Sequence, residues 1–211
     1  FWTEYCDWYT EASKAVMFGD DEARKNNTLS VMDFVLSNVL RLFHPFLPFI
    51  TEELWNDMGF NSDLPEDQGG KTIMTANWPK PFDDQMKEHY ALDETVDQLV
   101  GVRNDLIGLG RNLKSEFNIQ ANVKANFLFK PAGQIDPHEI GVLRILLNAK
   151  AIDLVTDTEP PKGTPSVGSL LGELFLPLEG LVDIDAEKAR LTKELDKVEK
   201  EIEKVIKKLG N

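Results

Sequence analysis

Cysteine, histidine and long apolar runs are scarce in this chain of 211 residues. The single cysteine, Cys6, excludes an internal disulfide and fits a reducing compartment, so we expect a cytoplasmic protein. No apolar run approaches the roughly 20 residues that a bilayer span requires, so we expect no membrane partner. The chain opens at Phe1, within a helical pattern and without a methionine or a charged-then-apolar leader. We therefore expect it to be a piece of a longer protein.

The residue patterns that catalysis or metal binding requires are also missing. The three histidines, His44, His89 and His138, lie far apart, and none has Cys, Asp or Glu neighbours at zinc-ligand spacing. Gly108-Leu109-Gly110 is not a phosphate-binding loop, because no strand precedes it and the third glycine is absent. Acid pairs such as Glu52-Glu53 fit the first turn of a helix, where the helix dipole favours negative charge. We predict no catalytic residue, no metal and no cofactor in this chain.

Negative charge dominates the chain, but it is unevenly distributed. The formal net charge is −13, which by itself argues against binding to nucleic acid. Residues 99–150, however, carry 7 basic and 4 acidic side chains, and residues 181–211 carry 8 of each. We therefore expect any contact with phosphate to lie mainly in the second half of the chain.

The first sixty residues show the spacing of three or four between apolar side chains that is typical of helices. One apolar face runs along residues 1–18, and Gly19-Asp20-Asp21 interrupts it. A second helix is predicted from near Thr28, and a third helix follows Pro48. The second helix is expected to turn Val31, Leu36, Val35, Val39, Leu40 and Phe43 toward a core. Helices this apolar, joined by short turns, suit a bundle.

Arg41 to Trp55 is the most distinctive stretch of the chain. Pro45 cannot sit inside a regular helix, and it biases His44 toward extended backbone. Pro48 suits the first position of a new helix, because its missing N–H would be unpaired there anyway. The stretch is thus predicted to form a helix, an apolar corner and a second helix. The residues expected to shape or pack this structural elbow are Phe43, His44, Pro45, Phe46, Pro48, Phe49 and Trp55.

The pattern after residue 83 predicts a long helix and then a small sheet with helices on one face. The long helix is expected from Asp84 to Phe117, and a shorter one from Asp136 to Leu147. Strands are expected at Val123–Phe129, at Ala151–Val155 and, paired across Gly172, at Ser166–Leu170 and Leu174–Leu178. The predicted fold class is therefore mainly α, with a helical bundle, a small α/β module and a C-terminal coiled-coil helix.

The last segment carries a coiled-coil pattern. Heptad a and d positions hold Ile184, Leu191, Leu195, Val198, Ile202, Val205 and Leu209. The opposite c and f positions hold a basic stripe of Arg190, Lys193, Lys197, Lys200, Lys204 and Lys207. The stripe could meet phosphates, or it could be a solvated face with i,i+4 pairs such as Asp196–Lys200. A seam without a partner helix is expected to self-associate or fray, as an artefact of truncation.

Three segments resemble class I valyl-tRNA synthetases, in the same order along the chain. Arg41–Trp55 is similar to the "LLHPFLPFITEELW" segment of that family, and Cys6-Asp7-Trp8-Tyr9 and Leu178–Glu187 resemble two further stretches of it. The resemblance implies three domains. They are an anticodon-binding helical bundle over residues 1–92 that lacks its first helices, a small α/β module over 93–180, and the first helix of a coiled-coil tRNA-binding arm over 181–211.

The same resemblance implies a function. The whole enzyme would attach valine to its tRNA using ATP, and this part would dock the anticodon stem and the elbow of the tRNA. The HIGH and KMSKS signatures that hold ATP are absent, so this part should not aminoacylate alone. The implied partners are valine tRNA and the catalytic and editing domains of the same chain. The candidate tRNA contacts are Arg103, Arg111, Lys114, Lys124 and the six bases of the stripe.

Two alternatives stay open. The chain could be a protein-interaction module that binds no RNA and dimerises through its heptads. It could also be the same region of an isoleucyl- or leucyl-tRNA synthetase, because those enzymes share the bundle. The run Leu178–Glu187 leading into a heptad helix favours valine.

Overall fold

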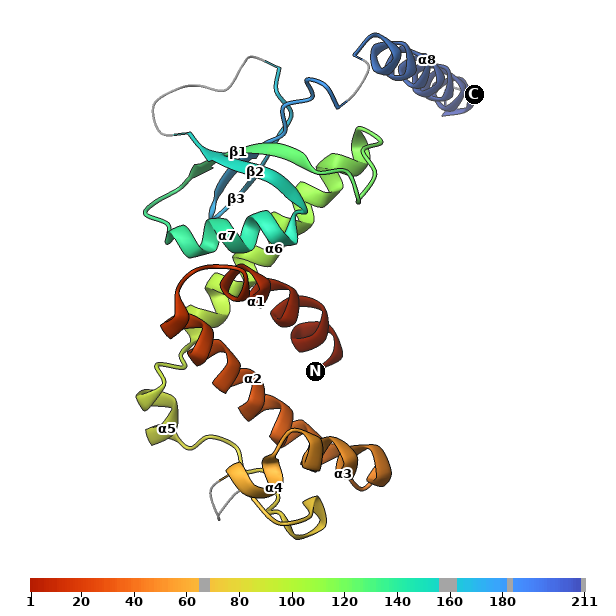
Figure 1. The fold of residues 1–211 in the computed structure, drawn as a ribbon. Coiled ribbons are helices and arrows are strands. Elements are labelled where there is room, and N and C mark those ends of the chain that lie inside the picture. The colour runs from red at the N-terminus through yellow and green to blue at the C-terminus, as the bar shows by residue number, and fades with distance from the viewer. Residues whose placement is uncertain (65–68, 156–162, 182–183, 210–211) are drawn as a thin grey trace. The chain divides into compact units, whose positions relative to one another are not determined.

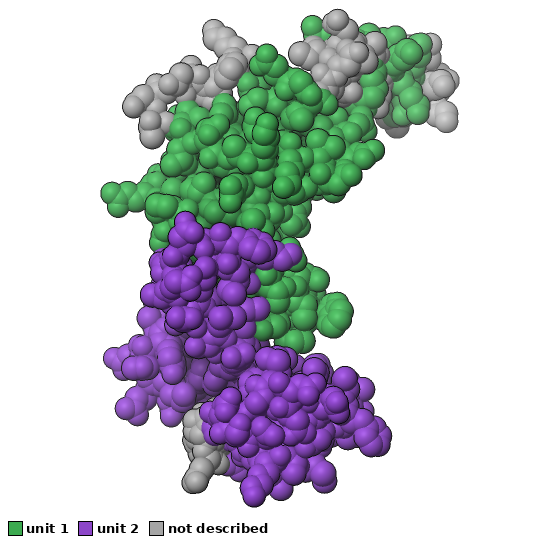
Figure 2. Space-filling model, in the orientation of Figure 1, with its two compact units in different colours: residues 1–12, 97–211 green, residues 13–96 purple. Residues whose placement is uncertain are grey.

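The computed structural model describes residues 1–64, 69–155, 163–181 and 184–209. The chain divides into two compact units, residues 13–96 and residues 1–12 with 97–211 (Figure 2). The first twelve residues thus group with the unit that contains the sheet, whereas their predicted place was in the bundle. The functional division at residues 92/93 and 180/181 stays a prediction.

The unit of residues 13–96 is helical (Figure 1). Its main helices are α2 (Glu22–Phe43), α3 (Pro48–Asp57) and the short α4 (Phe60–Asp63), and α1 (Thr10–Met17) leads into it. The predicted start of α2 near Thr28 is wrong by six residues. The Asp21 side chain accepts a hydrogen bond from the Arg24 backbone N–H at 3.0 Å and so caps a helix that begins at Glu22.

The predicted corner between two helices is confirmed, but the extended backbone expected at His44 is wrong. His44 has φ −52° and ψ −41°, and its N–H still donates to the Leu40 carbonyl, so the helical conformation continues up to Pro45. α2 ends at Phe43, and Pro48 occupies the first turn of α3. His44 Nδ1 lies 2.8 Å from Thr51 Oγ1, which in turn donates to the Leu47 carbonyl at 2.8 Å. These bonds satisfy polar groups of the corner and tie the end of α2 to the first turns of α3.

The packing expected around this corner is only partly correct. Trp55 is fully buried, where it contacts Phe60 edge-on and its Nε1 donates to the Gly70 carbonyl at 3.0 Å. Phe46 and Phe49, in contrast, are 80% and 92% exposed, so their expected burial is wrong. The expected burial is also wrong for Val31 and Phe43 of α2, which are 40% and 41% exposed. The buried face of α3 carries Thr51 and Trp55, four residues apart. Phe49 lies two residues before Thr51, about 200° around the helix, and therefore points away from that face.

The single long helix expected from Asp84 is instead two helices, α5 (Asp84–His89) and α6 (Glu94–Glu116). Ala91 has a positive φ of 50°, which a helix does not tolerate. The Asp93 carboxylate then accepts hydrogen bonds from the backbone N–H groups of Thr95 and Val96 and starts α6. Bonds from the Thr95 side chain and from these two amides lower the pKa of Asp93. The helical spacing of apolar residues continues across the break, so the sequence pattern could not reveal that α5 and α6 are separate helices.

The other unit is built on a four-stranded mixed sheet (Figure 1). Its strands are β1 (Ala125–Pro131), β2 (Ala149–Leu154), β3 (Ser166–Ser169) and β4 (Gly172–Phe175), in the order β2-β1-β4-β3. The β1–β2 pair is parallel and is joined by α7 (Pro137–Leu146), and the other two pairs are antiparallel. The presence of four strands and the pairing of the last two are confirmed, but some bounds are wrong. β1 begins at Ala125 and not at Val123, and Gly172 begins β4 instead of lying between the last two strands.

Helices α6 and α7 lie on the same side of this sheet (Figure 1). Ala125, Phe127 and Phe129, at alternate positions of β1, are fully buried. Gly110 of α6 is buried where the helix approaches Leu147 and Leu174. The chain before residue 10 forms a π-helix, η1 (Trp2–Tyr9), along which the rings of Phe1, Tyr5 and Tyr9 stack at 5.2 and 5.5 Å.

The predicted C-terminal helix is present as α8 (Ile184–Leu209). Four apolar residues of its heptad seam are exposed, namely Leu195, Val198, Ile202 and Val205. The side chains of Ile184, Leu191 and Leu209 lie outside the described ones. Among the helices of the described residues, none combines the length and the apolar character of a membrane span.

Candidate nucleic-acid interface

The first candidates for RNA contact are the basic residues of the segment 99–150, namely Arg103, Arg111, Lys114 and Lys124. In the structure some of these side chains are buried and others are exposed. Arg103 projects from α6 toward Glu139 of α7, with Nη1 3.4 Å from the Glu139 carboxylate and both side chains mostly buried. Its Nε is buried without a hydrogen-bond partner among the described atoms. Arg103 therefore serves an internal ion pair, and its assignment as a phosphate contact is not supported.

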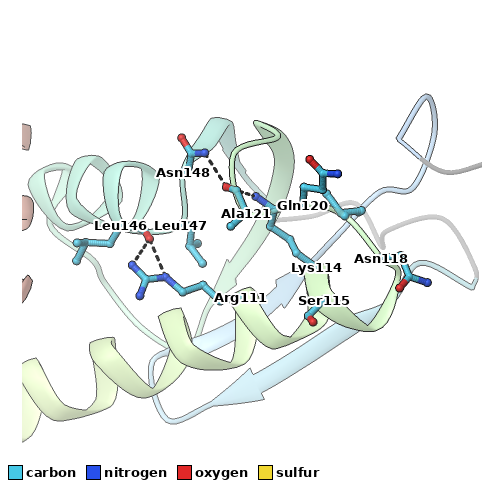
Figure 3. Close-up of a pocket in the computed structure, with 10 residues that line it drawn as sticks. Arg111, Lys114, Ser115, Asn118, Gln120, Ala121, Leu146, Leu147 and Asn148 are labelled. Atoms are coloured by element: carbon cyan, nitrogen blue, oxygen red, sulfur yellow. Dashed lines mark hydrogen bonds between the residues drawn. The ribbon is translucent and has the colours of Figure 1, made fainter.

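Lys114 lies beneath the C-terminal turn of α6, only 3% exposed. Its ammonium group donates to the Val123 carbonyl at 2.6 Å. It also lies 3.5 Å from the Ala121 carbonyl (Figure 3). Burial, and secondarily the charge of Arg111, lowers the pKa of Lys114. The ammonium thus fastens the 121–123 turn to α6 and is not available to a phosphate.

Arg111 joins three parts of its unit. Its Nη2 and Nε donate to the Leu146 carbonyl at 2.6 and 3.1 Å, at the C-terminal end of α7 (Figure 3). Its guanidinium carbon lies 5.3 Å from the centre of the Trp8 ring, within the range of a cation–π contact. A cation at a helix C-terminus is favourable, because unpaired carbonyls gather negative partial charge there.

These cations border a depression of about 610 Å³ between the C-terminal ends of α6 and α7. Its lining consists of Arg111, Lys114, Ser115, Asn118, Ile119, Gln120, Ala121, Leu146, Leu147 and Asn148 (Figure 3). Asn118 and Asn148 have φ values of 55° and 48°, and Asn148 Nδ2 donates to the Ala121 carbonyl at 2.9 Å. The positive charge of the depression is already committed to carbonyl groups, so the arrangement is a structural junction and not a phosphate cradle.

The exposed bases lie elsewhere. Lys124 is exposed just before β1, and Lys193, Lys197 and Lys200 are exposed on α8 at a spacing of four and three. That spacing puts the last three on one side of the helix. Arg190 donates to the Glu116 carbonyl at 3.3 Å. Lys204 and Lys207 belong to α8, but their side chains lie outside the described ones.

Among residues 99–150, three further exposed bases were not predicted as contacts, namely Lys130, Arg144 and Lys150. The period of two in β1 was a usable signal for Lys130. It follows the buried Phe127 and Phe129 and must therefore point to the opposite face. Within the described ranges, no three His, Cys, Asp or Glu side chains come together as metal ligands would.

Comparison with known families covers both ends of the chain. The family described as the anticodon-binding domain of tRNA ligase matches residues 1–128. The family described as the valyl tRNA synthetase tRNA binding arm matches residues 183–211.

Individual relatives cover the whole chain. It is 36% identical over 215 residues to the valine–tRNA ligase of Bacillus subtilis and 40% identical over 225 residues to that of Staphylococcus saprophyticus. The valine–tRNA ligase of Geobacillus stearothermophilus is 38% identical over 220 residues. Each comparison covers 100% of this chain but only 23% of the relative's length. The chain thus belongs to the anticodon-binding domain family of tRNA ligases and is homologous to the C-terminal part of valine–tRNA ligases.

Proposed function

We propose that this chain is the tRNA-docking region of a valine–tRNA ligase. The observation that carries the proposal is the order of the two family matches, an anticodon-binding domain followed by a tRNA-binding arm, along one chain. The exposed lysines of α8 supply the chemistry that the arm needs, because each base that neutralises a phosphate releases counterions.

In this proposal, different parts of the chain contact different regions of the tRNA. The helical unit would meet the anticodon end of the tRNA, and α8 would lie along its elbow. The catalytic domain of the same protein would attach valine to the tRNA, as the relatives' name, valine–tRNA ligase, indicates. That step would use ATP, and the editing domain would belong to the same chain. This chain, without the ATP-holding signatures, would orient the tRNA and not aminoacylate it. Such an enzyme works in the cytoplasm.

The contact set that we now propose differs from the one based on sequence. It keeps Lys124, Lys193, Lys197 and Lys200, and it retains Lys204 and Lys207 on their heptad positions alone. The bases that leave the set are Arg103, Arg111, Lys114 and Arg190, because their charged groups bind carbonyl or carboxylate oxygens within their own unit. Lys130, Arg144 and Lys150 join it as exposed bases.

A filter-binding titration of the 211-residue chain with valine tRNA, repeated at several salt concentrations, tests the proposal. We expect saturable binding that weakens steeply as salt rises. If no concentration of the chain retains the tRNA, while a full-length valine–tRNA ligase does, the docking role is wrong.

The protein-interaction alternative predicts the opposite dependence on salt. Apolar association through the exposed seam of α8 would persist or strengthen at high salt. Sedimentation of the chain without RNA over the same salt series separates the two. Isoleucine and leucine tRNAs, titrated in parallel, address the alternative that keeps the enzyme class and changes the amino acid.

A further inference from the structure

A groove in the helical unit remains unexplained by the contacts described so far. It has a volume of about 520 Å³ and lies between one side of α2 and the extended segment that leads into α5. The residues that define it are Phe34, Arg41, Trp78, Lys80, Phe82 and Met86. All of them belong to residues 13–96, so the groove lies within a single unit.

The groove is held in shape by a buried arginine. Arg41 is 5% exposed and donates from Nη1 to the Asn77 carbonyl at 2.9 Å. Its Nη2 donates to Asn38 Oδ1 at 3.0 Å and its Nε to the Ser37 carbonyl at 3.2 Å. The first bond fixes the extended segment against α2, and the other two fix the guanidinium to the helix itself. The groove is therefore formed before any ligand arrives.

Aromatic rings make up much of its wall. The rings of Phe34 and Phe82 stack at 5.5 Å with an interplanar angle of 12°, and Tyr90 follows Phe82 at 5.8 Å. Trp78 stands in the same groove but is 60% exposed. The first three rings are thus occupied with one another, whereas the Trp78 indole offers surface to an incoming planar group.

The charge of the groove is opposite to that of its surroundings. Residues 13–96 carry 15 acidic and 7 basic side chains. The residues that line the groove include Arg41 and Lys80 and no carboxylate. In a unit with an excess of acidic side chains, this groove brings a cation, Lys80, and an exposed aromatic ring, Trp78, together.

We propose that the groove takes one unpaired nucleobase from the anticodon loop of the bound tRNA, stacked on Trp78, with Lys80 at the neighbouring phosphate. Bases of single-stranded loops are splayed out and stack on aromatic side chains, whatever their identity, while basic groups follow the backbone. The groove also lies inside the region that matches the anticodon-binding family. This inference rests on the proposed docking function and assigns that function a specific surface.

The test uses the 211-residue chain and a short hairpin RNA with the anticodon stem and loop of valine tRNA. A 2-aminopurine is placed at each loop position in turn, because stacking on an indole quenches its fluorescence. We expect quenching at one loop position, and loss of that quenching in Trp78→Ala. We also expect Trp78→Ala to weaken hairpin binding roughly 10-fold, the scale of one lost base stack.

Three further variants make the test specific. Trp78→Phe keeps an aromatic face and should restore most of the affinity and the quenching. Lys80→Gln should weaken binding and reduce its salt dependence, while the quenching remains. Trp2→Ala removes another tryptophan that is 75% exposed but outside the groove, and it should change neither quantity. If Trp78→Ala proves unfolded by circular dichroism, the quenching in the unmodified chain and the Lys80→Gln result decide the question.

The outcomes separate this inference from the docking function. If whole tRNA binds but no loop position is quenched, or if Trp78→Ala binds the hairpin as the unmodified chain does, the groove serves another occupant and the inference is wrong. The docking function would then stand on the whole-tRNA result. If neither the hairpin nor the whole tRNA binds, both proposals fall together.

Discussion

Gly110 of α6 packs directly against Leu147, so closely that a Cβ atom at position 110 would stand 2.7 Å from Leu147 Cδ2. The same Cβ would stand 2.8 Å from Cδ2 of Leu174, on β4. Both leucines are fully buried, so neither can move aside freely. Gly108, two residues earlier in α6, lies about 200° around the helix from Gly110. A Cβ atom at position 108 would have no such neighbour within 4 Å.

The two glycines therefore predict opposite effects of alanine on stability. Gly108→Ala should raise the free energy of unfolding by about 0.5–1 kcal/mol, because alanine restricts the unfolded chain and favours the helix. Gly110→Ala should lower it by about 1–3 kcal/mol through overpacking. Urea unfolding of both variants, followed by circular dichroism, measures the difference. Equal stability of the two variants would contradict the close packing of α6 on Leu147.

Gly110 also shows where sequence patterns succeed and fail. Its spacing from other residues indicated only a weakened helix, since a single glycine does not say which neighbour it approaches. By contrast, the alternation of Ala125, Phe127 and Phe129 identified both the strand and its buried face, because a period of two has one interpretation. Pro45 and Pro48 likewise located the corner, since proline restricts its backbone wherever it occurs.

The candidate site was harder to predict than the fold. Arg103 and Lys114 are bases in a segment of positive net charge, and composition could not distinguish them from Lys124. Only the fold shows that Glu139 and the Val123 carbonyl, 36 and 9 residues away, receive their charged groups. The groove at Trp78 was invisible for the same reason, because Arg41 and Asn77 meet only through tertiary structure.

The buried ammonium of Lys114 is expected to contribute to the free energy of unfolding. Lys114→Met should cost about 1 kcal/mol, because the carbonyl groups of Ala121 and Val123 lose their donor. The exposed Lys124→Met is the control and should stay within about 0.5 kcal/mol of the unmodified chain.

The sign of the pH dependence follows from the lowered pKa of Lys114. Between that lowered value and the ordinary 10.5, the unfolded chain binds more protons than the folded one, so folding becomes more favourable as pH rises. The difference in unfolding free energy between the unmodified chain and Lys114→Met should therefore grow as pH increases toward 10.5. Urea unfolding at a series of alkaline pH values measures it, and a difference that shrinks would mean that the ammonium is not desolvated.

Trp55 and Phe49, the two aromatic residues of α3, should contribute unequally to the free energy of unfolding. Phe49→Ala should change the unfolding free energy by less than about 0.5 kcal/mol, because the ring is exposed. Trp55→Phe should cost about 1–3 kcal/mol, because it leaves the partly buried Gly70 carbonyl without its indole donor. Thermal unfolding of both variants checks this, and a large loss in Phe49→Ala would restore the packing role expected from the sequence.

The lysines of α8 give the sharpest prediction about tRNA. Lys193, Lys197 and Lys200 are exposed on one side of the helix, so a triple change to glutamine removes three cations without disturbing a described core. Each phosphate contact contributes about 0.7–0.9 to the slope of log affinity against log salt. If all three lysines meet phosphates, the slope should fall in magnitude by roughly 2–3, with a large loss of affinity at low salt.

A matched variant separates this local effect from a change in net charge. Lys25, Lys71 and Lys87 lie in the helical unit, and changing them to glutamine alters the net charge of the chain by the same amount. Long-range attraction to tRNA should fall similarly in both triple variants, but only the α8 variant should lose the contact slope. Filter binding over a salt series, with circular dichroism to confirm that α8 remains helical, makes the comparison. Equal slopes of log affinity against log salt in the two variants would show that the lysines of α8 are solvated and do not bind the phosphates of the tRNA.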